Sequence, residues 1–181
     1  MDARMLIAQG IGTIATIIAI WAYQCKDTKK LYLMQFFSNL GFTLHYLVLG
    51  AATGLLLNGM GTVRLVMLSF VKGKWARSNA AMWALMGVMV LCTVITWNGW
   101  LSLLPALAQV LSTPLYFRRS GKLLRYGQLF FMSPCWLIYN IFNYSIPGAV
   151  TDLMNITSVV VSLIRFKGQL DKPEESKGES I

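Results

Sequence analysis

Residues 78–117 read SNAAMWALMGVMVLCTVITWNGWLSLLPALAQVLSTPLYF, a run of 40 positions without Asp, Glu, Lys or Arg. One helix of that length would be about 60 Å long at about 1.5 Å per residue, whereas the hydrocarbon layer of a membrane is only ~30 Å thick. The pair Asn98-Gly99 near the middle of the run is a typical turn signal. We therefore predict two membrane-spanning helices, over 80–97 and 100–117, that fold back on each other at this turn.

The rest of the chain has the same pattern. Further charge-free runs cover 5–25, 31–63 and 126–151, and a shorter one covers 153–164. Turn signals divide the longer runs near Gly50 and at the segment that ends in Pro147-Gly148. The first run is interpreted as a spanning helix and not as a cleaved signal peptide, because no small-x-small cleavage site follows it. The predicted helices are 5–24, 31–49, 53–71, 80–97, 100–117, 124–142 and 148–166.

The composition agrees with a chain that lies almost wholly in the membrane. Apolar residues make up 56% of it, charged residues only 13%, and the mean hydropathy is +0.57. Soluble domains carry about 25% charged residues, so the composition excludes a water-soluble enzyme and a disordered protein. We predict an all-α membrane protein with seven transmembrane helices in a single domain, residues 1–168, followed by a disordered cytoplasmic tail, residues 169–181.

The positive charges predict the orientation of these helices. Fourteen of the 16 Lys and Arg residues fall between helices one and two, three and four, and five and six, or after helix seven. They are Lys26, Lys29, Lys30, Lys72, Lys74, Arg77, Arg118, Arg119, Lys122, Arg125, Arg165, Lys167, Lys172 and Lys177. Seven crossings place all four regions on one side, which the positive-inside rule makes cytoplasmic. We expect an outer N-terminus, a cytoplasmic C-terminus in a bacterial inner membrane, and contacts of the basic side with anionic headgroups but not with nucleic acid.

The two ends of the chain resemble each other. The segment DTKKLYLMQFF matches RSGKLLRYGQLFF, and a shift of 93 positions superposes Lys29 on Lys122, Gln35 on Gln128 and Tyr46 on Tyr139. This internal similarity predicts one three-helix repeat over about 5–72 and another over about 100–167, joined by the linker helix 80–97. Three is an odd number of crossings, so a second repeat that followed the first directly would insert into the membrane upside down. The additional crossing of the linker helix gives both repeats the same orientation, and an axis along the membrane normal then relates one repeat to the other.

This plan is similar to that of the SWEET and PQ-loop group of small transporters. Four local segments, IAQGIGTIA, LLPALAQVLST, WLIYNIFNYSIPGAV and the terminal IRF, resemble the YgjV family of bacterial inner-membrane proteins over about residues 6–167. The resemblance implies a 3-1-3 helix arrangement in the inner membrane. In SWEET-like proteins an asparagine in each third helix binds the substrate, and the matching positions here are Asn58 and Asn155.

Polar side chains recur inside the predicted helices at spacings of three and four, which places them on one face. Uncompensated polar groups are costly in hydrocarbon and often face a wet cavity, although Ser, Thr, Asn and Gln also join helices at about 0.6 kcal/mol per bond. The stripes occupy equivalent helices of the two repeats, so we predict one central cavity. Trp136 could stack on a substrate or contact lipid. The candidate substrate-binding residues are Gln35, Asn39, Asn58, Trp136, Tyr139, Asn140 and Asn155.

Three ionisable residues carry alternative interpretations. Arg64 either reaches back to the cytoplasmic surface or supplies a fixed positive charge for an anionic substrate. Asp152 either stabilises the start of its helix through the helix dipole or couples transport to protons. His45 either packs through hydrogen bonds or titrates near neutral pH.

The remaining chemistry is limited. One His and the separated Cys25, Cys92 and Cys135 predict no metal site, and we expect no cofactor and no enzymatic activity. Two functions stay open: a carrier for a small polar solute, or a non-transporting receptor or assembly protein that binds a lipid or protein partner. A homo-oligomer also stays open. The two functions differ in one respect: a carrier predicts that the polar stripes meet in one cavity, whereas a scaffold predicts that they pair locally.

Overall fold

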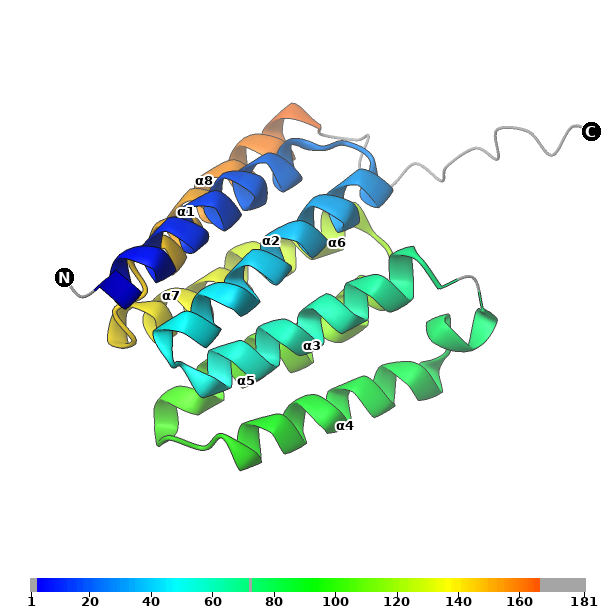
Figure 1. The fold of residues 1–181 in the computed structure, drawn as a ribbon. Coiled ribbons are helices and arrows are strands. Elements are labelled where there is room, and N and C mark those ends of the chain that lie inside the picture. Colours follow the sequence, from blue (N-terminus) through cyan, green and yellow to red (C-terminus); the bar gives the residue numbers. More distant parts are fainter. Residues whose placement is uncertain (1–2, 72, 167–181) are drawn as a thin grey trace, which may run out of the picture.

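The computed structural model describes residues 3–71 and 73–166, and the regular secondary structure in these ranges is all helical. The helices form seven rods, since α6, η3 and α7 continue into one another as a single rod (Figure 1). The bounds of these rods agree with the predicted helices to within a few residues. The predicted tail, residues 169–181, and Lys72 lie outside the described residues. The elements are α1 (Ala3–Gln24), α2 (Thr28–Leu49), α3 (Ala52–Ser69), η1 (Lys74–Arg77), α4 (Asn79–Ile95), η2 (Trp100–Ser102), α5 (Leu103–Phe117), α6 (Gly121–Gly127), η3 (Gln128–Met132), α7 (Ser133–Phe142) and α8 (Ile146–Arg165).

Local side-chain chemistry fixes where the rods begin and end. Asp27, Ser78 and Ser120 each accept a hydrogen bond from a backbone N–H in the first turn of the following helix, as N-cap residues do. Gly50 ends α2 with φ 83°, in the left-handed region that glycine adopts without a Cβ clash. Gly99 has φ 77° in the α4–α5 turn. The turns thus lie where the sequence predicted them.

The sixth rod is interrupted by one turn of π-helix. The N–H of Ser133 donates to the carbonyl of Gln128, five residues back. Pro134 follows and has no N–H to offer to the preceding turn, which favours a local change of helix register. The amide Nε2 of Gln128 donates to Ser133 Oγ over 2.7 Å and so holds the irregular turn.

Six of the rods form a closed ring. Main contacts run from α1 to α2, from α2 to α3, from α3 to α5, from α5 to the α6–η3–α7 rod, from that rod to α8, and from α8 back to α1. Helix α4 packs outside this ring, against α3 and α5, and lies at the edge of the bundle in Figure 1. The centre of the ring is therefore lined by six rods, and α4 packs on its outside, where Met89 joins a small core cluster with Leu57 and Ala106.

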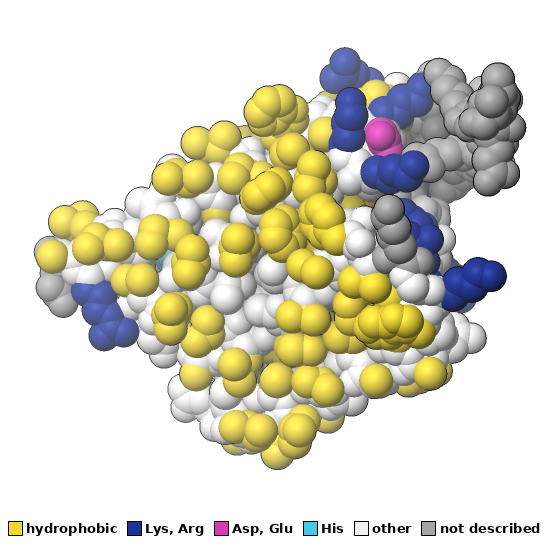
Figure 2. Space-filling model, turned by 45° about the vertical axis from the view of Figure 1, so that its right-hand side comes forward, with side chains coloured by type: hydrophobic (Ala, Val, Ile, Leu, Met, Phe, Trp, Pro, Cys, Tyr) yellow, Lys and Arg dark blue, Asp and Glu magenta, His cyan; other side chains and the backbone are white. Residues whose placement is uncertain are grey.

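The distribution of polarity is that of a membrane protein. The outer faces carry many exposed large apolar side chains, including Trp83, Leu91 and Val94 on α4. The interior holds buried Asn, Gln, Arg and Asp side chains. Figure 2 shows hydrophobic side chains over much of the visible face, with most of the visible Lys and Arg side chains gathered at one end and dark blue atoms also at the opposite end. By length and composition, four helical segments of the described chain are apolar enough to cross a membrane: Ala3–Gln24, Ala52–Ser69, Trp100–Phe117 and Ile146–Arg165.

Candidate functional site

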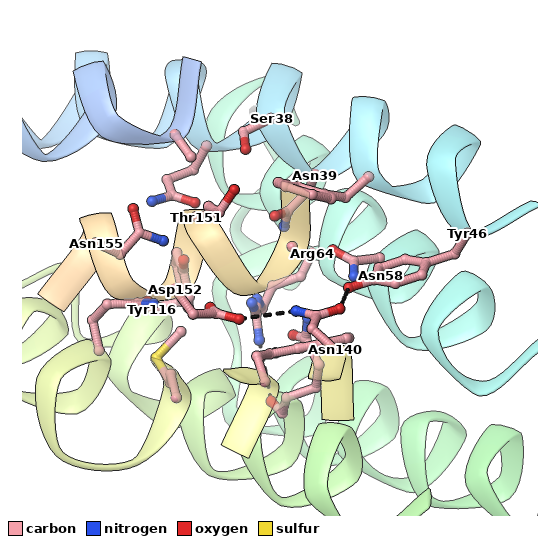
Figure 3. Close-up of a pocket in the computed structure, with 18 residues that line it drawn as sticks. Ser38, Asn39, Tyr46, Asn58, Arg64, Tyr116, Asn140, Thr151, Asp152 and Asn155 are labelled. Carbon is pink, nitrogen blue, oxygen red and sulfur yellow. Dashed lines mark hydrogen bonds between the residues drawn. The ribbon is translucent and has the colours of Figure 1, made fainter. Parts of the chain in front are cut away.

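A cavity lies inside the ring, and most of the residues that line it have polar side chains. It has a volume of about 70 Å³, and a single water needs about 10–15 Å³ measured in this way, so several waters or a small solute fit. Every rod of the ring contributes side chains, and α4 contributes none. The lining residues are Ala19, Gln35, Ser38, Asn39, Phe42, Tyr46, Asn58, Arg64, Gln109, Tyr116, Gln128, Met132, Trp136, Asn140, Gly148, Thr151, Asp152 and Asn155 (Figure 3).

Arg64 enters the cavity from α3 and does not reach the surface, so the interpretation that it extends to the cytoplasm is wrong. Its side chain is 1% exposed. Its Nη1 donates to the hydroxyl groups of Ser112 and Thr113, both at 2.9 Å, and its guanidinium carbon lies 4.0 Å from the ring centre of Tyr116. Hydrogen bonds and a cation–π contact compensate the buried charge, because α5 offers hydroxyl groups and an aromatic face at this level.

Asp152 belongs to the cavity and not to the start of its helix. Helix α8 begins at Ile146, and Asp152 lies in its second turn with 5% exposure, so the interpretation as a helix-start carboxylate is wrong. Its Oδ2 accepts a hydrogen bond from Asn140 Nδ2 over 2.9 Å, and Asn140 Oδ1 in turn accepts the hydroxyl of Tyr46 over 2.5 Å. The dashed lines in Figure 3 show this chain, which joins α2, α7 and α8.

Several polar atoms of this wall lack a partner. Arg64 Nε, Gln109 Oε1 and Asn155 Oδ1 are buried and make no hydrogen bond within the described ranges. The side chains of Asn39 and Asn58 also line the cavity, and they make no hydrogen bond to another described residue. A buried polar group without a partner costs about 1–3 kcal/mol. A polar guest in the cavity could provide the missing partners after small side-chain rotations.

Most of the residues singled out from the sequence meet at this cavity. Gln35, Asn39, Asn58, Trp136, Asn140 and Asn155 line it together with Arg64 and Asp152. Trp136 is 9% exposed and stacks on Tyr46 at 5.8 Å between ring centres, so its interpretation as a lipid contact is wrong. The polar stripes therefore meet at one cavity, where some of their members, such as Asn140 and Asp152, also hydrogen-bond to each other.

Tyr139 and His45 are the two predicted residues that do not line the cavity. Tyr139 accepts the backbone N–H of Gly54 with its hydroxyl oxygen at 2.9 Å. His45 is fully buried, with Nδ1 2.7 Å from the carbonyl of Ala8 and Nε2 2.8 Å from Ser145 Oγ. Its contacts match the packing interpretation, since both ring nitrogens have protein partners.

Six uncharged polar lining residues were not among the candidate substrate-binding residues. They are Ser38, Tyr46, Gln109, Tyr116, Gln128 and Thr151. A usable signal existed for Gln109, because it is the only Gln, Asn or charged residue in the run 101–117. Gln128 lies 93 positions after Gln35, the shift that aligns the two similar segments of the sequence, so the same alignment points to it.

The cavity lies between two apolar clusters. The first cluster, towards the basic end, includes Tyr23, Leu31, Leu68, Leu124 and Val159, and all six rods of the ring contribute to it. The second, towards the opposite end, is built from aromatic and small residues. Its members are Ala15, Phe42, Tyr46, Ala51, Ala108, Trp136 and Tyr139. Each cluster shares residues with the wall of the cavity: Tyr116 and Met132 belong to the first, and Phe42, Tyr46 and Trp136 belong to the second.

Arg125 was assigned to the charged surface from the sequence, and that assignment is wrong. The helix starts earlier than predicted, at Gly121, so Arg125 lies in its second turn and is fully buried. Its Nη2 donates to the carbonyls of Tyr23, at 3.1 Å, and Cys25, at 2.9 Å, and its Nε donates to Ser162 Oγ. The three cysteines are half-buried free thiols.

Comparison with known proteins places the chain in a family. A model of the Imp-YgjV family, described as bacterial inner membrane protein, matches residues 6–169. No curated protein and no solved structure matches the chain. The match covers almost all of the helical ring and α4, and it agrees with the segments that suggested the resemblance. The chain therefore belongs to the YgjV family of bacterial inner membrane proteins.

Proposed function

We propose that the protein carries a small polar solute across the inner membrane by alternating access. The observation that carries this proposal is the central cavity, where unpaired polar atoms from α3, α5 and α8 converge. A structural scaffold would pair such groups between helices, because an unpaired polar group is costly. The apolar clusters on either side of the cavity support the proposal, since a carrier needs a barrier at each end that can open in turn.

Equivalent contacts in the two halves support the proposed three-helix repeats. The hydroxyl of Tyr32 donates to the carbonyl of Tyr116 over 2.7 Å, at the end of α5. A shift of 93 positions turns this pair into Arg125 and Tyr23, and Arg125 donates to the carbonyl of Tyr23 at the end of α1. Such reciprocal contacts are typical of two-fold related units. The order of contacts around the ring, α1–α2–α3 and α5–(α6–α7)–α8, is also the same in both halves.

We further propose that all seven rods cross the membrane, with the N-terminus outside. Polar residues that face the cavity, such as Gln35 and Asn39 on α2, lower the hydropathy of a helix without exposing polar groups to lipid. The connections α1–α2, α3–α4 and α5–α6 and the end of α8 lie at the same end of the bundle (Figure 1). That end holds the exposed residues Lys26, Lys74 and Arg118, which the positive-inside rule assigns to the cytoplasm.

A tag at each terminus tests this topology. In intact bacterial spheroplasts, an N-terminal tag should be accessible to an added protease or antibody, and a C-terminal tag should become accessible only after lysis. An odd number of crossings requires that the two tags differ. Finding both tags on the same side would contradict seven crossings and, with them, two parallel repeats.

Flux through reconstituted protein tests the carrier itself. Proteoliposomes that contain the native chain should take up at least one of four radiolabelled probes, alanine, glycerol, glucose or lactate, faster than protein-free liposomes do. Asn58→Ala and Asn155→Ala should each reduce that uptake about tenfold, because a lost hydrogen bond to a buried polar group is worth about 1–3 kcal/mol. Their stability should change little, since neither amide is hydrogen-bonded to a described residue.

Asn98→Ala is the matched control. Asn98 is exposed in the α4–α5 turn and does not line the cavity, so this variant should transport like the native chain. If correctly folded native protein transports none of the four probes, the alternative function is favoured, in which the protein binds a lipid or protein partner without moving a solute.

A further inference from the structure

The guanidinium of Arg64 uses one nitrogen for its hydrogen bonds to Gln109, Ser112 and Thr113. All three leave from Nη1, and Tyr116 also interacts with the guanidinium. The Nε of Arg64 is buried and makes no hydrogen bond within the described ranges, so the edge formed by Nε and Nη2 does not serve the contacts with Gln109, Ser112 and Thr113. Two parallel N–H groups on one edge of a guanidinium match the two oxygens of a carboxylate. The free edge of Arg64 is therefore suited to an anionic group of that shape.

Asp152 offers the opposite charge in the same cavity. Its Oδ2 accepts one hydrogen bond, from Asn140, whereas a carboxylate has about four lone-pair sites. Within the described ranges, Arg64 and Asp152 each make their polar contacts with other groups and do not form an ion pair with one another. An isolated charge in a membrane interior is costly, and here a guanidinium group from α3 and a carboxyl group from α8 face one cavity without an ion pair between them within the described ranges.

From these two observations we propose that the cavity binds a small zwitterion, with its carboxylate on the free edge of Arg64 and its ammonium group on Asp152. The inference rests on the proposed carrier function and names its substrate class. A solute with a charge at each end satisfies both residues at once, whereas an anion or a cation satisfies only one.

The rest of the wall fits such a guest. Asn58 and Asn155 come from the same two helices as the charges and supply amide groups that can donate or accept. A cavity of about 70 Å³ admits a guest with few heavy atoms and leaves little room for a large side chain. The class that fits is therefore a short amino acid or a compound of similar size with separated charges.

Equilibrium binding to the purified full chain in detergent tests the proposal. The probes are alanine, propionate, ethylamine and glycerol, which carry both charges, the negative charge, the positive charge and no charge, respectively. The native chain should bind alanine at least about tenfold more tightly than the other three, because each charged hydrogen bond contributes about 1.5–3 kcal/mol. Equal affinity for alanine and propionate, or no detectable binding of alanine, would overturn the proposal.

Asp152→Asn provides the matched variant. It keeps the shape of the side chain and an oxygen that can accept from Asn140, and it removes only the charge. It should weaken alanine binding about ten- to a hundredfold and leave propionate binding unchanged. An equal loss for both probes, or no loss for either, would contradict the assignment of the ammonium group to Asp152.

The comparison of probes on the native chain decides the question even if Asp152→Asn fails to fold. The outcome is also separable from that of the carrier proposal. Binding of alanine without flux in proteoliposomes would remove transport and keep the zwitterion site. Flux of glycerol or glucose without alanine binding would keep transport and remove the zwitterion site.

Discussion

Arg125→Ala is expected to lower the free energy of unfolding by at least about 3 kcal/mol, since three acceptors, two of them in buried hydrogen bonds, lose a donor at about 1–3 kcal/mol each. These acceptors are the carbonyls of Tyr23 and Cys25 and the hydroxyl of Ser162. The two carbonyls belong to the last turn of α1 and the residue after it, where no further turn supplies N–H donors. The positive charge of Arg125 also interacts favourably with the negative C-terminal end of the α1 dipole. Removing it should loosen α1, α6 and α8 together.

Thermal unfolding of the purified variant in detergent measures this loss. Arg118→Ala serves as control, because it removes the same charge a few residues earlier at an exposed site and should change stability by no more than about 0.5 kcal/mol. A similar small effect for both variants would show that Arg125 does not hold the helix ends together.

Gly148→Ala is the second substitution with a large expected effect. A Cβ at this position would lie 2.5 Å from both Cγ and Oδ1 of Asn140 and 2.5 Å from Ser145 Oγ. Neither side chain can yield freely, because Asn140 joins Tyr46 to Asp152 and Ser145 contacts His45. We expect a loss of about 1–3 kcal/mol from overpacking, together with a further loss of about 1–3 kcal/mol for each buried polar group left without a partner.

The same variant should also lose solute binding, because Asn140 can no longer hold Asp152 in place. Unfolding in detergent and alanine binding are the two measurements. Gly87→Ala in α4 is the matched control, since a Cβ added at Gly87 would have no atom within 4 Å, and it should be neutral or stabilising by about 0.5–1 kcal/mol. Native-like stability and binding in Gly148→Ala would contradict the close packing of α8 on α7 at the cavity.

The helices could be predicted because their causes are local. A charge-free run longer than the membrane is thick must fold back, and the turns at Gly50 and Gly99 supply the left-handed backbone that such a reversal uses. The polar stripes were predictable for the same reason, since spacings of three and four define a helix face before any partner is known. These features account for the seven rods and for six of the seven proposed substrate-binding residues.

What the sequence could not decide is which helix lies next to which. Arg64, Asp152 and Arg125 were each assigned from their distance to a helix end, but their environments depend on neighbours more than 10 positions away: Ser112 and Thr113 for Arg64, and Tyr23 and Ser162 for Arg125. Only the ring of six rods brings α3, α5 and α8 to one cavity, where Arg64 and Asp152 face the same space without an ion pair between them within the described ranges. Hydropathy and spacing act along one helix, whereas burial and hydrogen bonding of a charge are properties of the packed assembly.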